Sequence, residues 1–420
     1  MDAQAGMLAR LFERSMGLGD EWEVSDVWFE KRGGAQDELH AGVAHRKGQA
    51  AECPVCHRKR GTYDTRERTW RHLDIWQYET IVHCAVPRAD CPEDGVHACR
   101  MPWEVRPSSH FTALFEVQVI VMALSGMAVT AIAHLVHETD TRIWRLLGKA
   151  VAEARDAAGY SDVVRVGIDD TARRRGQSCI SIMADLDGQR VIAVTEGRDK
   201  GAVGRLCGEL EGHGGDRTKV QEVTRDMAEA CSLGVAAEMP QAVQTVDRFH
   251  VVQLLNRAID HVRCAKKRRQ LAGTKYVWLK RKESLTERQL AKREELDPAK
   301  THLRTARACQ MGEALQDVYS CAGRESAARA LDRLCSWMMH SNVREMKTVA
   351  RTLRKEREGI LNWWKRGSTN SFLEGLNSVV QSVRSAARGF RSIAYFRTMI
   401  FLRLGRLGFT AQKKLACATH

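Results

Sequence analysis

Three aspartates close apolar runs that alternate in the manner of β-strands. Asp169 ends VVRVGID, Asp226 ends KVQEVTRD and Asp247 ends AVQTVD. Acids at strand ends face the rim of a sheet, and neighbouring strands lie about 5 Å apart, so these carboxylates could converge. Hard cations such as Mg²⁺ take oxygen ligands of this kind. The pattern predicts a magnesium site, although each aspartate could equally begin an ordinary loop after its strand.

A further acid, Glu374, lies in a polar stripe of an otherwise apolar helix. Asn370, Glu374, Asn377 and Ser378 recur at the spacing of one helical face. The same segment also fits a capping box, in which Ser371 and Glu374 satisfy amides at the helix N-terminus without any chemistry. The residues alone leave both interpretations open.

A CPVC knuckle, from Cys53 to Cys56, can place two thiolates on one tetrahedral Zn²⁺. Further thiols and imidazoles follow at His83, Cys84, Cys91, His97 and Cys99. The alternative is a set of ordinary buried cysteines. The thirteen cysteines are odd in number, and the N-terminus lacks the basic-then-apolar order of a signal peptide. We therefore expect a cytoplasmic protein and no secreted disulfide framework.

Three short helices are expected after the cysteine clusters. The uncharged stretch Val117–Val136 is about long enough to span a bilayer, but polar residues and Ser125-Gly126 interrupt it, so we expect two packed helices and no membrane span. A third helix, Thr139–Arg155, begins with capping residues. This spacing fits a helix-turn-helix, although three such helices could also form a core or dimerisation element. The residues expected in the major groove are Arg142, Arg145 and Lys149.

The candidate acids need a sheet to position them, and residues 161–250 supply its strands. A first strand is followed by a hairpin with Asp187-Gly188 at its turn, and then by alternating helices and strands. The order β-β-β-α-β-α-β fits an α/β ribonuclease-H-like fold, a mixed sheet covered by helices. Residues 253–364 read as almost unbroken basic helix, and residues 370–403 as further helix.

The charge of the chain points to a polyanionic partner. The formal net charge is +14, and residues 261–310 and 381–420 together carry more net positive charge than the whole chain. Solvated basic helix faces are the alternative. The residues expected to contact phosphates without reading bases are Arg263, Lys266, Lys267, Arg268 and Arg269.

The order of these motifs resembles that of a known family. VGIDDTA, VTRDM, VDRFHVVQLLNRAIDHVR, TNSFLEGLNSVVQ and ARGFRS are similar to motifs of the DDE transposases of bacterial insertion sequences, specifically the ISL-three family. The resemblance implies that Asp169, Asp226 and Glu374 form the catalytic triad. It also implies that Asp247 and His250 match a D-x-x-H signature. Asp170 stands where the family often has Glu, and we expect Asp170, Asp247 and His250 to lie around the triad. His250 could orient a phosphate or a flanking base, or could equally be an ordinary structural histidine.

The resemblance implies two kinds of metal. A pair of Mg²⁺ ions at the triad would flank the scissile phosphate and serve both hydrolysis and strand transfer. CPVC and VPRADCPEDGV resemble the family's zinc finger, which implies structural Zn²⁺ on Cys53, Cys56 and Cys91. Where the family usually has Cys or His three residues after the last of these, this chain has Asp94. The fourth ligand therefore stays open among Asp94, Cys84, His97 and His72.

The implied function is a DNA transposase that binds the terminal inverted repeats of its element and cuts and joins strands. The expected partners are double-stranded DNA, both element ends and target, and at least one further copy of the chain, because two ends must meet. The alternative is a non-catalytic DNA-binding repressor derived from a transposase. The expected organisation is an N-terminal region with a zinc finger (1–107), a helix-turn-helix (108–158), the first part of a ribonuclease-H-like catalytic domain (159–262), an all-helical basic insertion (263–364) and the C-terminal part of the catalytic domain (365–420).

Overall fold

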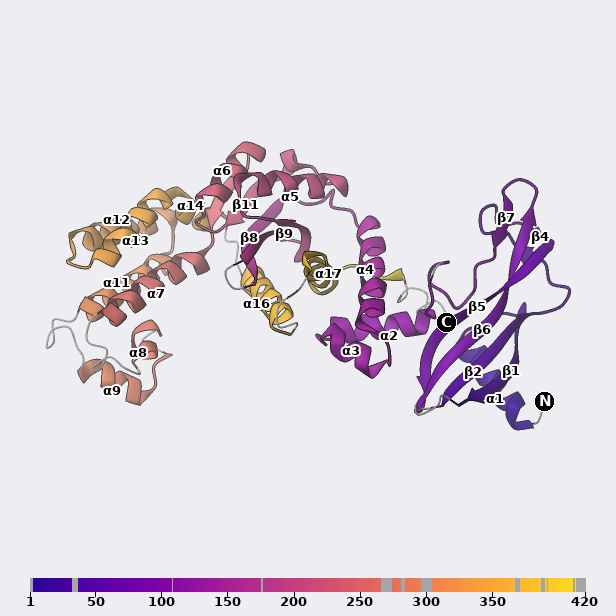
Figure 1. The fold of residues 1–420 in the computed structure, drawn as a ribbon. Coiled ribbons are helices and arrows are strands. Elements are labelled where there is room, and N and C mark those ends of the chain that lie inside the picture. Colours follow the sequence, from indigo (N-terminus) through magenta and orange to yellow (C-terminus); the bar gives the residue numbers. More distant parts are fainter. Residues whose placement is uncertain are drawn as a thin grey trace. The chain divides into compact units, whose positions relative to one another are not determined.

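The chain folds into two compact units (Figure 1). The computed structural model describes residues 3–31, 37–107, 109–174, 177–265, 274–280, 284–295, 304–366, 371–386, 390, 392–410 and 412. The first unit comprises residues 1–158 together with 383–420, and the second comprises residues 159–382. This division differs from the expected one, because the end of the expected C-terminal catalytic segment, 365–420, packs with the first unit.

A mixed β-sheet, which the sequence analysis did not predict, fills the start of the first unit. Its order is β1-β2-β6-β5, with β7 paired to β6, and β2 and β6 run parallel. Every second side chain of β6 from Thr80 to Val86 is buried, as expected for a strand with one covered face. The elements of this region are α1 (Ala3–Ser15), β1 (Trp22–Glu30), β2 (Glu38–His45), β3 (Ala51–Glu52), β4 (Lys59–Arg60), β5 (Thr62–Ile75), β6 (Tyr78–Cys91) and β7 (Gly95–Ala98).

Three helices follow this sheet, as the sequence predicts. They are α2 (Ala113–Leu124), α3 (Val129–Leu135) and α4 (Asp140–Asp156). The side chains of Thr112 and Thr139 cap α2 and α4, and Gly126 breaks the apolar stretch with a φ of +96° that favours glycine. Within the part of the chain that the structure describes, no helix is long and apolar enough to cross a membrane.

A C-terminal helix, α17 (Ile393–Leu404), completes the first unit by packing on α2 and α4. The ring of Tyr395 stacks on Trp144 of α4 with centroids 4.2 Å apart. The Arg155 guanidinium lies 3.8 Å from the centroid of Phe401. These aromatic contacts join α17 to α4, whereas the sequence analysis expects α17 in the C-terminal part of the catalytic domain.

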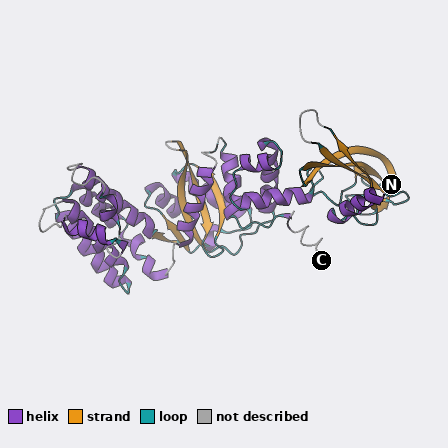
Figure 2. Cartoon of the chain, turned by 90° about the horizontal axis from the view of Figure 1, so that it is seen from below, coloured by secondary structure: helices purple, strands orange, loops and turns teal. Residues whose placement is uncertain are grey.

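The second unit contains a five-stranded sheet with the order β10-β9-β8-β11-β12. The two groups of strands drawn in Figure 2 are the sheets of the two units. Here β8, β9 and β10 are antiparallel, β11 and β12 run parallel to β8, and the predicted Asp187-Gly188 turn joins β9 to β10. The elements are β8 (Arg165–Arg174), β9 (Gln177–Asp185), β10 (Arg190–Glu196), α5 (Lys200–Gly212), η1 (Arg217–Lys219), β11 (Glu222–Arg225), α6 (Glu229–Glu238) and β12 (Val243–Val246).

Helices account for the described remainder of the second unit, as expected for an insertion. Leu255, Met311, Leu334 and Leu353 belong to their shared apolar core. The helices are α7 (Arg248–Ala265), α8 (Lys275–Leu279), α9 (Glu287–Glu295), α11 (Arg304–Tyr319), α12 (Arg324–His340), α13 (Arg344–Lys355), α14 (Arg357–Leu361), α15 (Trp363–Arg366) and α16 (Ser371–Ala386), the last of which runs into the first unit.

Candidate active site and metal centre

The register of three parallel strands, β8, β11 and β12, brings the predicted aspartates to the same level of the second sheet. We call this group of positions, Asp169, Asp226 and Asp247, the edge of the sheet. Arg225 of β11 pairs with Ile168 of β8 on one side and with Val246 of β12 on the other. The residue that follows each of these three positions is an aspartate. These residues are Asp169, Asp226 and Asp247. Asp226 and Asp247 directly follow the ends of β11 and β12, as predicted. Asp169 instead lies within β8, which continues to Arg174 in its pairing with β9, so it does not close its strand as the sequence suggested. The register nevertheless makes the three acids neighbours.

Backbone amides hold the carboxylates of this edge. Asp169, which is buried, accepts a hydrogen bond of 2.8 Å from the amide of Asp170. Asp226 accepts one of 2.8 Å from Ala228, and Asp247 one of 2.8 Å from the amide two residues further on. The last two bonds satisfy amides at the starts of α6 and α7, so the loop-initiating role considered for these aspartates is present alongside any chemical one.

Negative charge accumulates at this edge. Burial, reinforced by the charges of Asp226 and Asp169, raises the pKa of Asp170 to about 6, although Ser181 donates a hydrogen bond to it. Burial alone would lower the pKa of His250, but its hydrogen bond with Asp169 and the surrounding carboxylates raise that pKa above its ordinary value. The His250 Nε2 atom lies 3.5 Å from Asp169 Oδ1. Such a cluster favours a bound cation.

The contacts above do not include the third predicted acid, Glu374, and they do not bring the carboxylates together as a complete metal site. Glu374 lies in α16, but its side chain is outside the described residues. That helix is tied to the sheet by Gln381, whose Nε2 donates a 3.2 Å hydrogen bond to Thr171 Oγ1 of β8. Among the described side chains, the carboxylates of the edge do not form a group of three ligand atoms within 4.8 Å of one another.

The expected phosphate contacts of the insertion are only partly described. The Arg263 side chain is 15% exposed and forms a 2.7 Å ion pair with Asp260. Its guanidinium is thus engaged by a neighbouring carboxylate, and its contact with DNA stays a prediction. The other expected residues, Lys266, Lys267, Arg268 and Arg269, lie outside the described residues.

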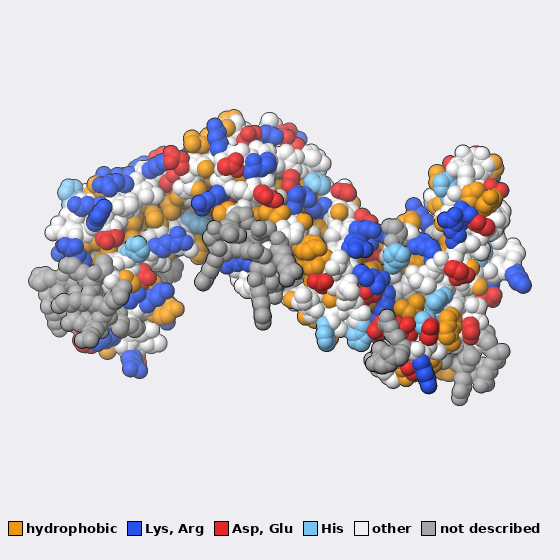
Figure 3. All heavy atoms as spheres, viewed as in Figure 1, with side chains coloured by type: hydrophobic (Ala, Val, Ile, Leu, Met, Phe, Trp, Pro, Cys, Tyr) orange, Lys and Arg blue, Asp and Glu red, His pale blue; other side chains and the backbone are white. Residues whose placement is uncertain are grey.

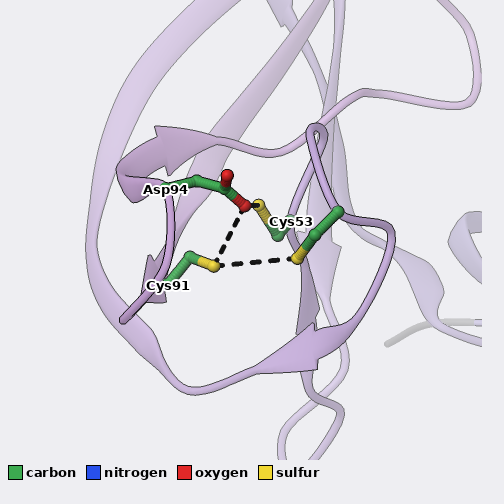
Figure 4. Close-up of side chains that lie close together, drawn as sticks. Cys53, Cys91 and Asp94 are labelled. Atoms are coloured by element: carbon green, nitrogen blue, oxygen red, sulfur yellow. Dashed lines mark hydrogen bonds between the residues drawn. The ribbon is translucent and has the colours of Figure 1, made fainter.

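Four candidate metal ligands converge in the first unit. They are Cys53, Cys56, Cys91 and Asp94, whose ligand atoms all lie within 4.8 Å of one another. The Asp94 Oδ2 atom lies 3.6 Å from Cys53 Sγ and 3.3 Å from Cys91 Sγ, and Figure 4 shows these three side chains pointing toward one another. The sulfurs of Cys56 and Cys91 are 3.7 Å apart. The knuckle between β3 and β4 thus faces the turn between β6 and β7.

The other candidates for the fourth ligand are engaged elsewhere. Burial raises the pKa of Cys84 to about 12, which disfavours its thiolate. The His97 ring contacts the backbone oxygen of Asp94 at 2.7 Å. The His72 ring contacts Thr112 Oγ1 at 2.9 Å, and burial lowers its pKa to about 4. Of the four alternatives, Asp94 is the residue that lies with the three cysteines.

Sequence reasoning missed Arg60, which lies beside this cluster. Its pKa is raised above the ordinary arginine value, chiefly by the sulfur of Cys56 and also by that of Cys91. Arg60 also forms a 3.3 Å ion pair with Glu93. A site with four anionic ligands and one divalent cation keeps a net negative charge, which this arginine offsets. No motif in the sequence singles out such a residue.

The basic residues predicted on α4 differ in their surroundings. The Arg142 guanidinium donates bonds of 2.7 and 2.6 Å to Glu138 and lies 4.8 Å from the centroid of Phe111. Arg145 and Lys149 are exposed. Burial, followed by the nearby arginine and lysine charges, lowers the pKa of His110. Figure 3 shows Lys and Arg side chains gathered over α4. This surface fits an anionic partner.

Comparison with known families agrees with this modular arrangement. A model of zinc fingers of the IS204/IS1001/IS1096/IS1165 transposases matches residues 49–97. A model of the helix-turn-helix domain of ISL3 transposases matches residues 101–151, and an ISL3 model described as a transposase matches residues 166–400. The zinc finger and the helix-turn-helix thus precede the transposase domain, in the predicted order.

Curated relatives match over most of their length. The transposases for insertion sequence element IS1557 from two Mycobacterium tuberculosis strains, CDC 1551 / Oshkosh and ATCC 25618 / H37Rv, are each 27% identical, covering 91% of this chain and 92% of theirs. The transposase for insertion sequence element IS1001 from Bordetella parapertussis is 25% identical, covering 82% of this chain and 86% of its own. Because the transposase-domain model alone matches more than half of the chain, the protein belongs to the ISL3 family of insertion-sequence transposases.

Proposed function

We propose that this transposase binds the terminal inverted repeats of its insertion sequence and cuts and joins DNA strands through a DDE triad of Asp169, Asp226 and Glu374. The observation that carries the proposal is the register of β8, β11 and β12, in which aspartates follow three paired positions at one edge of the sheet. Family membership supports transposition as the overall activity.

The proposed catalytic fold is ribonuclease-H-like. Three antiparallel strands followed by two parallel ones, in the order β10-β9-β8-β11-β12, agree with the mixed sheet expected from the sequence. In such a sheet the carboxyl ends of the central parallel strands present their side chains at a common rim. The insertion separates Glu374 from the other two acids along the chain. Glu374 nevertheless belongs to the same unit, because it lies in the part of α16 that precedes residue 383.

The third acid is assigned by its place on α16. Position 374 precedes Gln381 by seven residues, or about two turns, so the two positions share a helix face. Gln381 contacts Thr171, two residues beyond Asp169, so α16 meets β8 at that position. The capping interpretation of Ser371 and Glu374 is the alternative that a variant can test.

The residues of the edge fit a hard divalent cation, because Asp169, Asp226 and Asp247 follow paired positions of neighbouring strands and offer carboxylate oxygens. When bound at Asp169, Asp226 and Glu374, a pair of Mg²⁺ ions would activate water or a 3′-hydroxyl and stabilise the leaving oxygen. The chain's own contribution is to fix the ligands. The amide of Asp170 and the His250 ring orient Asp169, and the amide of Ala228 orients Asp226.

The proposed structural metal is Zn²⁺ on Cys53, Cys56, Cys91 and Asp94. Sulfur separations near 3.7 Å suit tetrahedral coordination with bonds of about 2.3 Å. This ion would fasten the β3–β4 knuckle to the β6–β7 turn. An aspartate in place of a fourth thiolate is uncommon in structural sites, so we expect a weaker site than one with four cysteines.

Nicking of end DNA separates the proposed enzyme from its rival, a non-catalytic repressor. The wild-type protein is incubated with duplexes that carry the element's end or a scrambled sequence, with Mg²⁺ or with a chelator. We expect cleavage at the end only, and only with the metal. End-specific binding without any cleavage at all metal concentrations would favour the repressor instead.

A further inference from the structure

One buried arginine joins the helical insertion to the proposed catalytic edge. Arg225 is the last residue of β11 and directly precedes Asp226. Its Nη2 donates a 2.9 Å hydrogen bond to Glu356 Oε2, and its Nη1 donates one of 2.7 Å to the backbone oxygen of Asp226. Its Nε donates a third, of 2.6 Å, to Gln244 Oε1. One guanidinium thus contacts the catalytic loop, a neighbouring strand and the insertion.

Both members of this ion pair are removed from solvent. The side chains of Arg225 and Glu356 are 5% and 7% exposed. Water cannot replace a missing partner at such a depth, so each charge depends on the other. Other ion pairs of the insertion, such as that of Arg357 with Asp332 at 35% and 54% exposure, lack this dependence.

The insertion is docked on the sheet at the same place. Asn362, which follows α14, donates a 2.9 Å hydrogen bond to the backbone oxygen of Gln244 in β12. Gly359 of α14 lies so close to β12 that an added Cβ would be 2.8 Å from Val246 Cγ2. Glu356 begins this docked segment, because it lies between the end of α13 and the start of α14. The carboxylate therefore approaches Arg225 from a fixed support.

The backbone of Arg225 extends the effect to a second acid. Its carbonyl oxygen accepts a 2.9 Å hydrogen bond from the amide of Asp247. Movement of Arg225 would consequently disturb the loops that follow both β11 and β12. The Arg225 side chain is thus held by the insertion. Its main chain continues directly into Asp226 and accepts the hydrogen bond from Asp247.

From these contacts we propose that Glu356 is a positioning residue, through which the helical insertion fixes Asp226 by way of Arg225. The inference rests on the proposed function, in which Asp226 is a metal ligand. It assigns the insertion a role beyond contact with DNA: the catalytic edge is set correctly only when α13 and α14 are docked. Residues that support a metal ligand typically change metal affinity by about 10- to 100-fold when altered.

Metal binding tests this role without relying on catalysis alone. Glu356→Gln removes the charge and keeps the shape, and Asp332→Asn is the matched control in an exposed pair of the same insertion. Mn²⁺ affinity is measured by calorimetry on the folded full-length proteins, and the Mg²⁺ dependence of end cleavage is measured in parallel. We expect Glu356→Gln to weaken metal affinity about tenfold or more, with cleavage recovering at high Mg²⁺, and Asp332→Asn to match wild type.

A second variant guards against a folding defect. Arg225→Lys keeps a positive charge for Glu356 but cannot make all three hydrogen bonds, so we expect the same decrease in metal affinity with DNA binding retained. Wild-type metal affinity in either folded variant would overturn the positioning role. So would a loss of cleavage that Mg²⁺ cannot rescue while metal affinity stays normal. Cleavage by Asp226→Asn at the wild-type rate would instead overturn the proposed triad, which keeps the two failures distinct.

Discussion

The basic residues of α4 differ in their contacts, and these contacts indicate different roles. Arg142 is committed to Glu138, whose side chain is only 5% exposed, and so joins the end of α3 to the start of α4. Arg145 and Lys149 lie one and two turns further on and are exposed. The sequence predicted all three as contacts to DNA, because it shows their spacing but not their partners.

We therefore predict that Arg145→Ala and Lys149→Ala weaken binding to end DNA. If either side chain binds a phosphate, the slope of log affinity against log salt should fall by about 0.9 for each phosphate that is no longer neutralised. If Arg145 reads a base, discrimination against scrambled DNA should fall as well. Arg142→Ala should instead lower the unfolding temperature, because it removes the main partner of the Glu138 carboxylate, which is largely shielded from solvent.

Salt-dependent binding titrations and thermal unfolding of the three variants measure these effects. An unchanged salt slope and unchanged affinity in both Arg145→Ala and Lys149→Ala would remove α4 from the DNA interface. Normal thermal stability in Arg142→Ala with a large decrease in DNA affinity would return that residue to the interface.

At the scale of elements, strand periodicity predicted the sheet of the second unit and missed the N-terminal one. The apolar runs before Asp169 and Asp226 are short and end in acids, so their places in the sheet follow from the sequence. The strands β5 and β6 are 14 residues long, and the first eight residues of β5 include seven exposed or half-exposed polar side chains and an exposed tyrosine. Such an edge strand carries a weak hydrophobic pattern.

Three features of the structure depend on tertiary packing and could not be predicted from the local sequence. The assignment of α17 depends on rings contributed by α4, more than two hundred residues earlier in the chain. The spacing after Cys91 points to position 94, but the residue type there is unusual for zinc; it is the turn between β6 and β7 that brings Asp94 to the three cysteines. The buried pair of Arg225 and Glu356 joins two segments 131 residues apart.

The proposed zinc ligands lead to a prediction for the β3–β4 knuckle and the β6–β7 turn. Cys91→Ala should abolish binding of one Zn²⁺ per chain and destabilise the first unit, because metal binding contributes to the stability of such small knuckles. Asp94→Cys should bind zinc more tightly than wild type, since four thiolates are a preferred structural set. Cys84→Ala, a buried cysteine of the same strand outside the cluster, is the matched control.

Zinc content by mass spectrometry and competition with a chelator measure this series. Retention of zinc by Cys91→Ala would exclude the proposed cluster. If Cys84→Ala lost its zinc while an Asp94→Asn variant kept it, the fourth zinc ligand would be Cys84 and not Asp94.

For the whole molecule, the proposed function divides recognition and chemistry between the two units. The first holds the zinc-finger cluster and the helix-turn-helix, and the second holds the aspartates of the catalytic edge together with the insertion. The proposed reaction needs both, because we assign recognition of the element's ends to α4 in the first unit and metal binding to the acids of the second. Because two element ends must be joined, we expect the active complex to contain at least two copies of the chain.

Cleavage and joining of end DNA by triad variants tests this division most directly. Asp169→Asn, Asp226→Asn and Glu374→Gln remove charge from the proposed metal ligands while keeping their shape, and Asp187→Asn alters an exposed acid at the β9–β10 turn as the control. We predict that the three triad variants bind end DNA within a few-fold of wild type but neither cut nor join it at any Mg²⁺ concentration, whereas the control does both. Near wild-type cleavage by Asp169→Asn or Asp226→Asn would contradict the proposed site, and near wild-type cleavage by Glu374→Gln would move the third acid elsewhere and leave Glu374 as a helix cap.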